Sequence, residues 1–476
     1  MFDVIVIGGG VIGGLVLREL TKYRLRVCLL EKENDVCMGA SKANSGIVHA
    51  GYDAVPNSLK AKFNVQGNRM MAKVCQDLGV KYRNNGSLVV AFSEEEIETL
   101  RGLKARGEEN GVEGLEILDQ TRLRAMEKNI SDEAVAALYA PTGGIVCPYE
   151  LTIAAIGNAM DNGAVLYTDF DVAAIDKSED KFLIRSANAK EVVGKVVINC
   201  AGLASGKIAS FVGDEYIDVK GRKGEYILLD RESGDFVNHT LFFTPTKLGK
   251  GILVTQTVDN NILLGPTAEE RDDADTTTSA DGLAFVIEKA RKMCKNPPLF
   301  NTITSFAGVR AYSSRHDFII EESKTVKGMI HCAGIESPGL TASPAVAQFV
   351  VESLVGKMID LEENVAFCGR RKPDYFFKNL SIEEKNEIIR RDPSYGKIVC
   401  RCEQITEGEI LRAIRENPPA RDIDGVKRRT RSGMGRCQGG FCQPYVADLL
   451  AKEQGIALEE VTKCGKGSYL LTGVTK

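Results

Sequence analysis

The N-terminal stretch from Phe2 to Leu20 constrains the fold more strongly than any other part of the chain. An apolar run, Val4 to Ile7, enters the turn Gly8-x-Gly10-x-x-Gly13, and an amphipathic segment follows the turn. A strand, a glycine turn and a helix in this order are the fingerprint of a dinucleotide-binding βαβ unit. Gly8 permits the tight turn, Gly10 lets the backbone approach a pyrophosphate, and Gly13 allows the helix to pack closely on the strand.

An acidic residue stands where such a unit needs one. Glu31 closes a second apolar run, Val27 to Leu30, eighteen residues after Gly13. From this position a carboxylate accepts a hydrogen bond from a ribose hydroxyl, while the helix N-terminus offers partial positive charge to phosphates. The motif does not distinguish NAD from FAD, and a glycine-rich turn in an ordinary βαβ unit is the alternative.

Composition narrows the class of protein. With 476 residues, 43% hydrophobic and 26% charged, the chain is expected to be a soluble globular protein of about three domains. A net charge of −4 gives no electrostatic reason to expect nucleic acid or an anionic membrane as a partner. The longest apolar stretch, Val4 to Leu17, is broken by five glycines and is too short for a transmembrane segment. Because the N-terminus has no basic region typical of a signal peptide, we expect a cytoplasmic location.

Four of the thirteen cysteines are grouped, whereas most of the others are scattered singly in apolar surroundings as expected for buried thiols. The grouped residues are Cys400-x-Cys402 and, after thirty-four intervening residues, Cys437-x₄-Cys442. Each pair lies near a predicted helix N-terminus, whose dipole lowers thiolate pKa and favours metal binding. Zinc sites usually space both pairs by two to four residues, so the pattern favours a four-thiolate [2Fe–2S] cluster over zinc or free thiols.

Taken together, these motifs resemble a known superfamily. The opening fingerprint, the strand end Cys200-Ala-Gly202 and the late Gly334-x₄-Gly339-Leu-Thr341 resemble D-amino-acid-oxidase-type FAD-dependent oxidoreductases. Ser41 to Ala50, followed by Pro56 to Lys62, is similar to L-2-hydroxyglutarate oxidases. The C-terminal region instead resembles the large subunit of anaerobic glycerol-3-phosphate dehydrogenase, and its cysteine spacing resembles that of bacterioferritin-associated-ferredoxin [2Fe–2S] domains.

The resemblance implies FAD as the cofactor and assigns residues to it. Glycines and an acid would hold the ADP half, a polar loop would contact the pyrophosphate or ring, and two later loops would line the flavin. These residues are Gly8, Gly10, Gly13, Glu31 and Lys32 for the ADP half, Val172 for the adenine through its backbone, Ser41, Asn44, Ser45 and Gly46 for the polar loop, and Gly202, Gly339, Leu340 and Thr341 for the flavin.

The predicted fold class is α/β plus α+β. A Rossmann-like FAD domain with a parallel sheet is expected from residues 1–80, 145–218 and 325–360. An antiparallel-sheet substrate domain is expected from residues 81–144 and 219–324, because short β-branched runs recur after residue 219. Residues 361–395 are expected to form a linker, residues 396–455 a small helical [2Fe–2S] domain, and residues 456–476 a C-terminal tail.

Flavin oxidation of a secondary alcohol needs a base for the hydroxyl proton and a cation for the anionic end of the substrate. His49 is the candidate base, and a structural histidine is the alternative. Arg310 matches an arginine that grips the substrate anion in related enzymes, and a domain-interface salt bridge is the alternative. Lys62, Lys247 and Lys250 add weak support for an anion.

The expected function is that of an FAD-dependent dehydrogenase acting on a small anionic secondary alcohol, first of all sn-glycerol 3-phosphate. Electrons would leave singly through the [2Fe–2S] cluster to an accepting protein subunit or carrier, through which the protein could dock on a membrane. The rivals are a 2-hydroxy acid such as L-2-hydroxyglutarate as the substrate, and a non-catalytic relay subunit. Arg428, Arg429 and Arg431 are interpreted as tuning the cluster or receiving a partner, or as an ordinary solvated basic turn.

Overall fold

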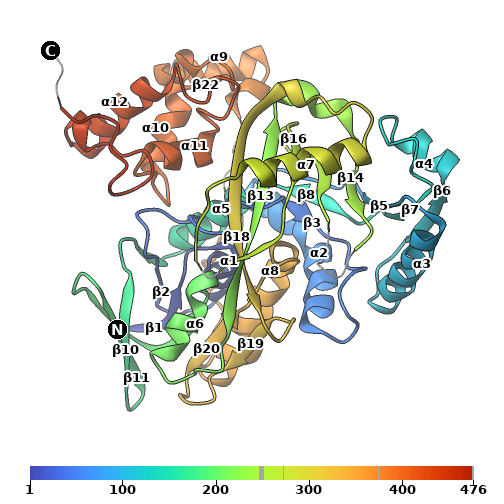
Figure 1. Cartoon of the computed structure of the whole chain (residues 1–476). Coiled ribbons are helices and arrows are strands. Elements are labelled where there is room, and N and C mark those ends of the chain that lie inside the picture. Colours follow the sequence, from blue (N-terminus) through green and yellow to red (C-terminus); the bar gives the residue numbers. More distant parts are fainter. Residues whose placement is uncertain (246–250, 272, 372–375, 474–476) are drawn as a thin grey trace.

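The computed structural model describes residues 1–245, 251–271, 273–371 and 376–473. These residues form two large sheets with their helices and a small C-terminal helical module (Figure 1). The module, in orange and red, lies beside the second sheet and over the helices of the first. This agrees with the predicted class, α/β plus α+β with a helical C-terminal region.

The first sheet has eight strands and a parallel centre. Its strands are β1 (Phe2–Ile7), β2 (Val27–Leu30), β9 (Val165–Tyr167), β10 (Val172–Ser178), β11 (Lys181–Ser186), β12 (Glu191–Asn199), β19 (Ile319–Glu322) and β20 (Met329–Ala333). β1 pairs in parallel with both β2 and β12, which places the glycine turn at the carboxyl edge of the sheet. β10, β11 and β19 join by antiparallel pairing.

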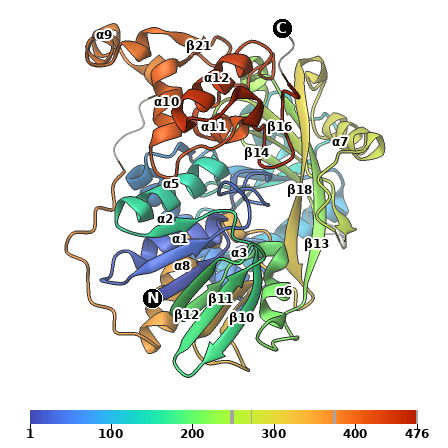
Figure 2. The same cartoon turned by 90° about the vertical axis from the view of Figure 1, so that its left-hand side faces the viewer.

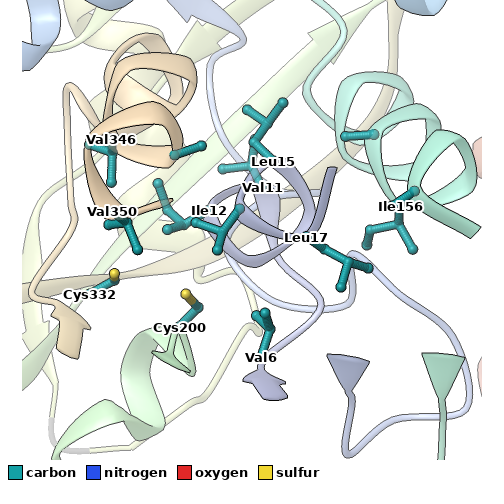
Figure 3. Packing of buried hydrophobic residues seen from close by; sticks show 14 of the residues in the cluster. Val6, Val11, Ile12, Leu15, Leu17, Ile156, Cys200, Cys332, Val346 and Val350 are labelled. Atoms are coloured by element: carbon teal, nitrogen blue, oxygen red, sulfur yellow. The ribbon is translucent and has the colours of Figure 1, made fainter. Parts of the chain in front are cut away.

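Helix α1 (Val11–Leu20) is the centre of the first hydrophobic core, packed between α5 (Pro148–Asp161) and α8 (Gly339–Phe349). Figure 3 shows apolar side chains of α1 between Ile156 of α5 and Val346 of α8. A fully buried side chain of this kind contributes roughly 1.5–3 kcal/mol, so the buried face of α1 fixes the helix firmly on the sheet.

The second sheet has nine strands and mostly antiparallel pairing. Its strands are β5 (Ser87–Ala91), β6 (Glu116–Asp119), β7 (Ala136–Ala140), β13 (Val219–Leu229), β14 (Thr240–Phe243), β15 (Leu253–Gln256), β16 (Ile262–Gly265), β17 (Glu269–Arg271) and β18 (Thr302–Ser313). Three helices accompany it: α3 (Glu94–Glu109), α4 (Gln120–Met126) and α7 (Ala280–Met293). The longest pairing joins β13 to β18.

The described residues also contain a small three-stranded sheet and a long helix. The sheet consists of β3 (Ile47–Val48), β8 (Gly144–Val146) and β4 (Tyr82–Arg83). The helix is α2 (Leu59–Leu78), which packs along α8. Its N-cap is Ser58, whose Oγ accepts a hydrogen bond from the Ala61 amide.

The C-terminal module contains β21 (Ile398–Cys400), β22 (Ile405–Thr406), α10 (Glu407–Arg415), α11 (Ile423–Thr430) and α12 (Gln443–Gln454). Its separate core includes Ile410, Val426 and Leu450, all fully buried. Thr406 and Glu409 form a capping box at the start of α10, since they exchange both hydrogen bonds.

The connection from α8 to the module carries α9 (Ile382–Arg391) and is bound to the first sheet's helices along the part before residue 372. Asn158 Nδ2 donates to Cys368 O, and Arg18 Nη2 donates to Gly369 O, both at 2.9 Å. Arg371 N donates to Asp77 O at 2.9 Å. These bonds hold the connection against the molecule (Figure 2).

The pairing of β19 bears on the predicted domain boundaries. β19 falls inside the segment 219–324 that was predicted for the substrate domain, but it pairs with β20 in the first sheet. The division of the chain into domains stays a prediction. No helix among the described residues is long and apolar enough to cross a membrane.

Candidate functional site

A cavity of about 1010 Å³ lies between the carboxyl edge of the first sheet and the inner face of the second. Its volume is at the upper end for cofactor pockets. The predicted cofactor and catalytic residues that line it are Gly8, Gly10, Glu31, Lys32, Ser41, Asn44, Ser45, Gly46, His49, Val172, Gly202, Arg310, Gly339 and Leu340. Gly13 and Thr341 do not line it. They lie behind its wall, in the glycine turn and in α8.

The glycine turn has no room for side chains. A Cβ on Gly8, whose φ is +108°, would lie 2.4 Å from Cys200 O, and one on Gly13 would lie 2.0 Å from Gly8 O. A Cβ on Gly10 would point at the hydroxyl of Ser41, 3.1 Å away. The turn therefore presents bare backbone at the N-terminus of α1, which is the cradle that an anionic pyrophosphate requires.

Glu31 lies at the end of β2, next to this turn. Its Oε2 accepts a hydrogen bond from the Gly9 amide at 2.7 Å, and its Oε1 accepts one from the Glu33 amide at 3.0 Å. Burial raises the pKa of Glu31, although the two amides oppose this shift. The carboxylate lies at the cavity wall, where the ribose of a dinucleotide would meet it.

The polar loop from Ser41 to Gly46 is held in place by its own side chains. Ser41 Oγ accepts from the Val11 amide at 2.9 Å, so this hydroxyl lies at the first turn of α1. Asn44 Oδ1 accepts from the Gly46 amide at 2.9 Å, and Ser45 Oγ lies 3.4 Å from the hydroxyl of Tyr226. The loop thus brings hydroxyl groups between the first helix and the second sheet.

His49 and Arg310 line the same cavity from different elements. The backbone amide of His49 donates to Thr341 Oγ1 at 2.9 Å, and its Nε2 lies 3.2 Å from Ser337 Oγ. Arg310 belongs to β18, and its Nη2 donates to Thr267 O at 3.2 Å. The buried Nε of Arg310 has no hydrogen-bond partner among the described residues. A buried guanidinium donor without a partner is the group that an anionic ligand would satisfy.

The sequence reasoning missed a second group of charges in this cavity. Arg222 of β13 lies directly opposite Arg310, and in an antiparallel pair such residues share one face of the sheet. Glu336 accepts from Lys60 Nζ at 2.9 Å and lies 3.5 Å from Arg222 Nη1. The alternation Arg222, Gly224, Tyr226 along a strand could have indicated the inward face.

The predicted lysines contribute differently. Lys62 lies outside the cavity, with its Nζ over the rings of Phe63 and Phe349, whereas its neighbour Lys60 lines the cavity. Lys247 and Lys250 fall outside the described residues.

The four paired cysteines form two contacting pairs in the module, in which Cys400 and Cys442 are buried and Cys402 and Cys437 are partly exposed. Cys402 Sγ and Cys437 Sγ are 3.5 Å apart, and Arg231 next to the second sheet donates to Cys402 O. The Cys400 thiol is hydrogen-bonded to the Cys442 thiol, and this bond, together with amides of Gly433 and Glu403, lowers the pKa of Cys400 to about 6.

This arrangement suits a two-iron cluster. Two thiolates on one tetrahedral metal ion lie about 3.7 Å apart for metal–sulfur bonds of about 2.3 Å. The two pairs, Cys402 with Cys437 and Cys400 with Cys442, are each close enough for this. Two separate pairs are expected where each of two irons takes two thiolates.

The basic segment before Cys437 is neither a solvated turn nor open to a partner. Arg428 and Arg429 are buried against Asp35, at 2.6 and 2.7 Å. Arg431 is buried between Glu403, at 3.0 Å, and Asp259, at 2.7 Å. These arginines join the module to both large sheets, which corrects their interpretation as a solvated basic turn or as a surface that receives a partner. An effect of these arginines on the cluster stays a prediction.

Comparisons with known proteins agree with this site. Residues 3–353 match a family described as FAD dependent oxidoreductase, and residues 398–452 match the BFD-like [2Fe-2S] binding domain. The molecule is therefore a flavin-dependent oxidoreductase with an iron–sulfur module, and the predicted cofactors, FAD and a [2Fe–2S] cluster, are confirmed.

Individual relatives are also dehydrogenases and oxidases. The chain is 48% identical to a glycerol 3-phosphate dehydrogenase of Caloramator mitchellensis, covering 100% of this chain and 99% of that one. An L-2-hydroxyglutarate dehydrogenase of Escherichia coli (strain K12) is 32% identical, covering 56% and 64%. The solved structure of an FAD-bound L-alpha-glycerophosphate oxidase from Mycoplasma pneumoniae superposes with a TM-score of 0.73 at 29% identity, covering 78% and 98%. The chain belongs to the FAD dependent oxidoreductase family of the D-amino-acid-oxidase type.

Proposed function

We propose that this protein is a dehydrogenase that oxidises sn-glycerol 3-phosphate to dihydroxyacetone phosphate. The observation that carries the proposal is the 48% identity with a glycerol 3-phosphate dehydrogenase over the whole chain, cluster module included. Two further observations support it. The cavity contains an arginine pair suited to an anion, and the module offers a one-electron exit that a direct reaction with oxygen would not need.

Arg310 and Arg222 are assigned to the phosphate of the substrate. Arg222 lies opposite Arg310 and is partly neutralised by Glu270, at 3.4 Å, and Glu336, at 3.5 Å. The buried Nε of Arg310, which has no partner among the described residues, is therefore the main donor left for an anion. A guanidinium fork also binds a phosphate through parallel hydrogen bonds. Glu336 and Lys60 hold Arg222 in place.

His49 is assigned to the proton of the substrate hydroxyl. An imidazole can accept this proton near neutral pH, and Ser337 and Thr341 fix the residue on the cavity wall. Bound FAD supplies the acceptor for the hydrogen of the carbon atom that is oxidised. Gly8, Gly10, Gly13, Glu31 and the loops around Ser41, Gly202 and Gly339 are proposed to hold this cofactor, and Cys400, Cys402, Cys437 and Cys442 the cluster.

A 2-hydroxy acid is the second candidate substrate, because the chain also aligns with an L-2-hydroxyglutarate dehydrogenase over 56% of its length. The test is an anaerobic absorbance titration of purified protein with each compound, following flavin and iron–sulfur bands together. We expect glycerol 3-phosphate to bleach the flavin and then reduce the cluster. Bleaching by L-2-hydroxyglutarate alone would refute the proposed substrate.

The electron acceptor is proposed to be a protein subunit or carrier that docks near the cluster. We propose a cytoplasmic location, with contact to a membrane only through such a partner. Co-purification under native conditions with and without a membrane fraction tests both points. Binding of the purified protein to lipid vesicles that contain no protein would contradict contact with a membrane only through a partner.

A further inference from the structure

The loop after β2 is bonded to the glycine turn at both of its ends. Glu31 Oε2 accepts from the Gly9 amide at 2.7 Å, and the Cys37 amide donates to Gly9 O at 2.9 Å. A Cβ on Gly9 would lie 2.8 Å from Glu31 Oε2 and 3.3 Å from Val36 Cγ1. The loop from residue 31 to residue 37 and the glycine turn therefore form one packed unit. A conformational change in one segment must alter the conformation of the other.

Asp35 in this loop binds two arginines of the iron–sulfur module. Its Oδ2 accepts from Arg428 Nη2 at 2.6 Å and from Arg429 Nη1 at 2.8 Å, and its Oδ1 accepts from Arg429 Nη2 at 2.7 Å. All three side chains are more than nine-tenths buried. Burial alone would raise the pKa of Asp35, but the charges of Arg429 and Arg428 hold it below its usual value. The carboxylate is thus a charged, desolvated link between two parts of the chain.

Arg428 and Arg429 belong to α11, and the chain after this helix leads to Cys437 and Cys442. Its N-terminal cap, Asp422, accepts from Asn34 Nδ2 at 2.7 Å, so both ends of α11 contact the loop that holds Asp35. After α11 the chain turns at Arg431, whose φ is +69° and whose Nε donates to Glu403 beside Cys402. One helix therefore separates the cofactor loop from the cysteines of the cluster.

We propose that Asp35 is a positioning residue that couples occupancy of the FAD site to docking of the iron–sulfur module. FAD holds the glycine turn and its loop in the conformation that presents Asp35 to Arg428 and Arg429. By thermodynamic linkage, a docked module must then strengthen FAD binding by the same factor by which FAD strengthens docking. The inference rests on the two cofactors and not on the identity of the substrate.

The first test is FAD binding by the full-length protein after removal of FAD, with the cluster retained. Titration of FAD, followed by quenching of its fluorescence, gives a Kd for the wild type, for Asp35→Asn and for the control Asp424→Asn. Asp424 is on the same helix but pairs with Lys463 inside the module. We expect Asp35→Asn to raise the Kd about tenfold or more and Asp424→Asn to leave it within about twofold.

The second test measures docking directly by amide hydrogen exchange. In the wild type, FAD should slow exchange in α11 about fivefold or more, and in Asp35→Asn this response should disappear. The electron paramagnetic resonance spectrum of the dithionite-reduced variant verifies that it keeps its cluster. We expect it to do so, because Asp35 is not one of the four cysteine ligands.

A third variant disturbs the same contact without removing a charge. Gly425→Ala removes no charge but adds a Cβ 3.1 Å from both Asp35 Oδ2 and Asp422 Oδ1, the two carboxylates through which α11 contacts the loop, so it should weaken FAD binding in the same direction. An unchanged Kd in both Asp35→Asn and Gly425→Ala, with exchange of α11 indifferent to FAD, would overturn the proposal. Because no substrate is added, this result is independent of the outcome of the substrate titration.

Discussion

Arg310 is the single residue on which recognition of the substrate anion is expected to depend most. Arg310→Met keeps the length of the side chain and removes its charge and donors. A hydrogen bond to a charged group contributes about 1.5–3 kcal/mol, so kcat/KM for glycerol 3-phosphate should fall on the order of tenfold to a hundredfold, mainly through KM. Steady-state assays with an artificial electron acceptor measure this effect.

The matched control is Arg315→Met, which removes an exposed arginine just beyond the end of the same strand, paired with Glu321. It should leave both constants unchanged, because surface ion pairs contribute little. If Arg310→Met behaves like this control, a subunit that only relays electrons becomes the better description.

His49 is expected to act on the rate of the chemical step and not on binding. His49→Gln retains a polar side chain near Ser337 but removes the imidazole that accepts a proton. General-base catalysis typically contributes 10²- to 10⁴-fold, so anaerobic flavin reduction in a stopped-flow experiment should slow by about that factor, with little change in KM. An unaltered reduction rate would assign His49 a structural role only.

At the scale of elements, the crossing of α2 and α8 determines where His49 lies. A Cβ on Gly67 of α2 would lie 2.0 Å from Thr341 O of α8, and Thr341 Oγ1 accepts from the His49 amide. Gly67→Ala should therefore push the helices apart, lower the free energy of unfolding by about 1–3 kcal/mol and reduce kcat as well. Urea unfolding and steady-state kinetics measure the two effects.

Gly102→Ala is the matched control, because Gly102 is an exposed helical glycine with no atom within 4 Å of the new Cβ. Alanine there should stabilise the protein by roughly 0.5–1 kcal/mol. Equal behaviour of the two variants would show that the close helix crossing has no influence on the site.

Short sequence motifs predicted the elements that hold the cofactors. Contacts between residues far apart in the sequence could not be predicted, because no local motif indicates them. Gly8, Gly10 and Glu31 lie within one βαβ unit, so their spacing alone predicted that they share one wall of the cavity. Arg431 was misinterpreted because its partner Asp259 is 172 positions away in the chain. Arg222 was missed for the same reason, since only the pairing of β13 with β18 brings it opposite Arg310.

For the whole molecule, the cluster should be separable from the flavin site. Cys437→Ser removes a thiol whose partner lies 3.5 Å away, so the purified variant should lose iron and acid-labile sulfide while retaining FAD. Cys368→Ser, at an exposed cysteine in the connection, should keep both. Zinc in place of iron in the wild-type protein would disprove the cluster assignment.

Acid should weaken the docking of the module. The pKa of Asp259 is lowered, because the charges of Arg431 and Lys81 outweigh its burial. A lowered folded-state pKa gives stability that is present above the unfolded value, about 3.9, and is lost as pH falls toward the folded value. The free energy of unfolding should therefore decrease steeply below about pH 5.

Asp259→Asn should lower the free energy of unfolding by about 3–5 kcal/mol at pH 7, because it leaves Arg431 partly uncompensated. Its deficit relative to the wild type should narrow as the pH is lowered below 4. Asp180→Asn, on an exposed turn, is the control and should follow the wild-type curve. A constant difference between Asp259→Asn and the wild type from pH 7 to pH 3 would contradict the ionised pair.

The connection bound to Asn158 and Arg18 has a consequence for the strength of the interface it serves. A module tethered in this way meets its docking surface at an effective concentration that reaches the millimolar range. Contacts that would be far too weak to hold two separate chains together at cellular dilution can then keep the module docked most of the time. The ion pairs at Asp35 and Asp259 therefore need to supply orientation more than affinity, and a single cut in the connection would make the assembly sensitive to dilution.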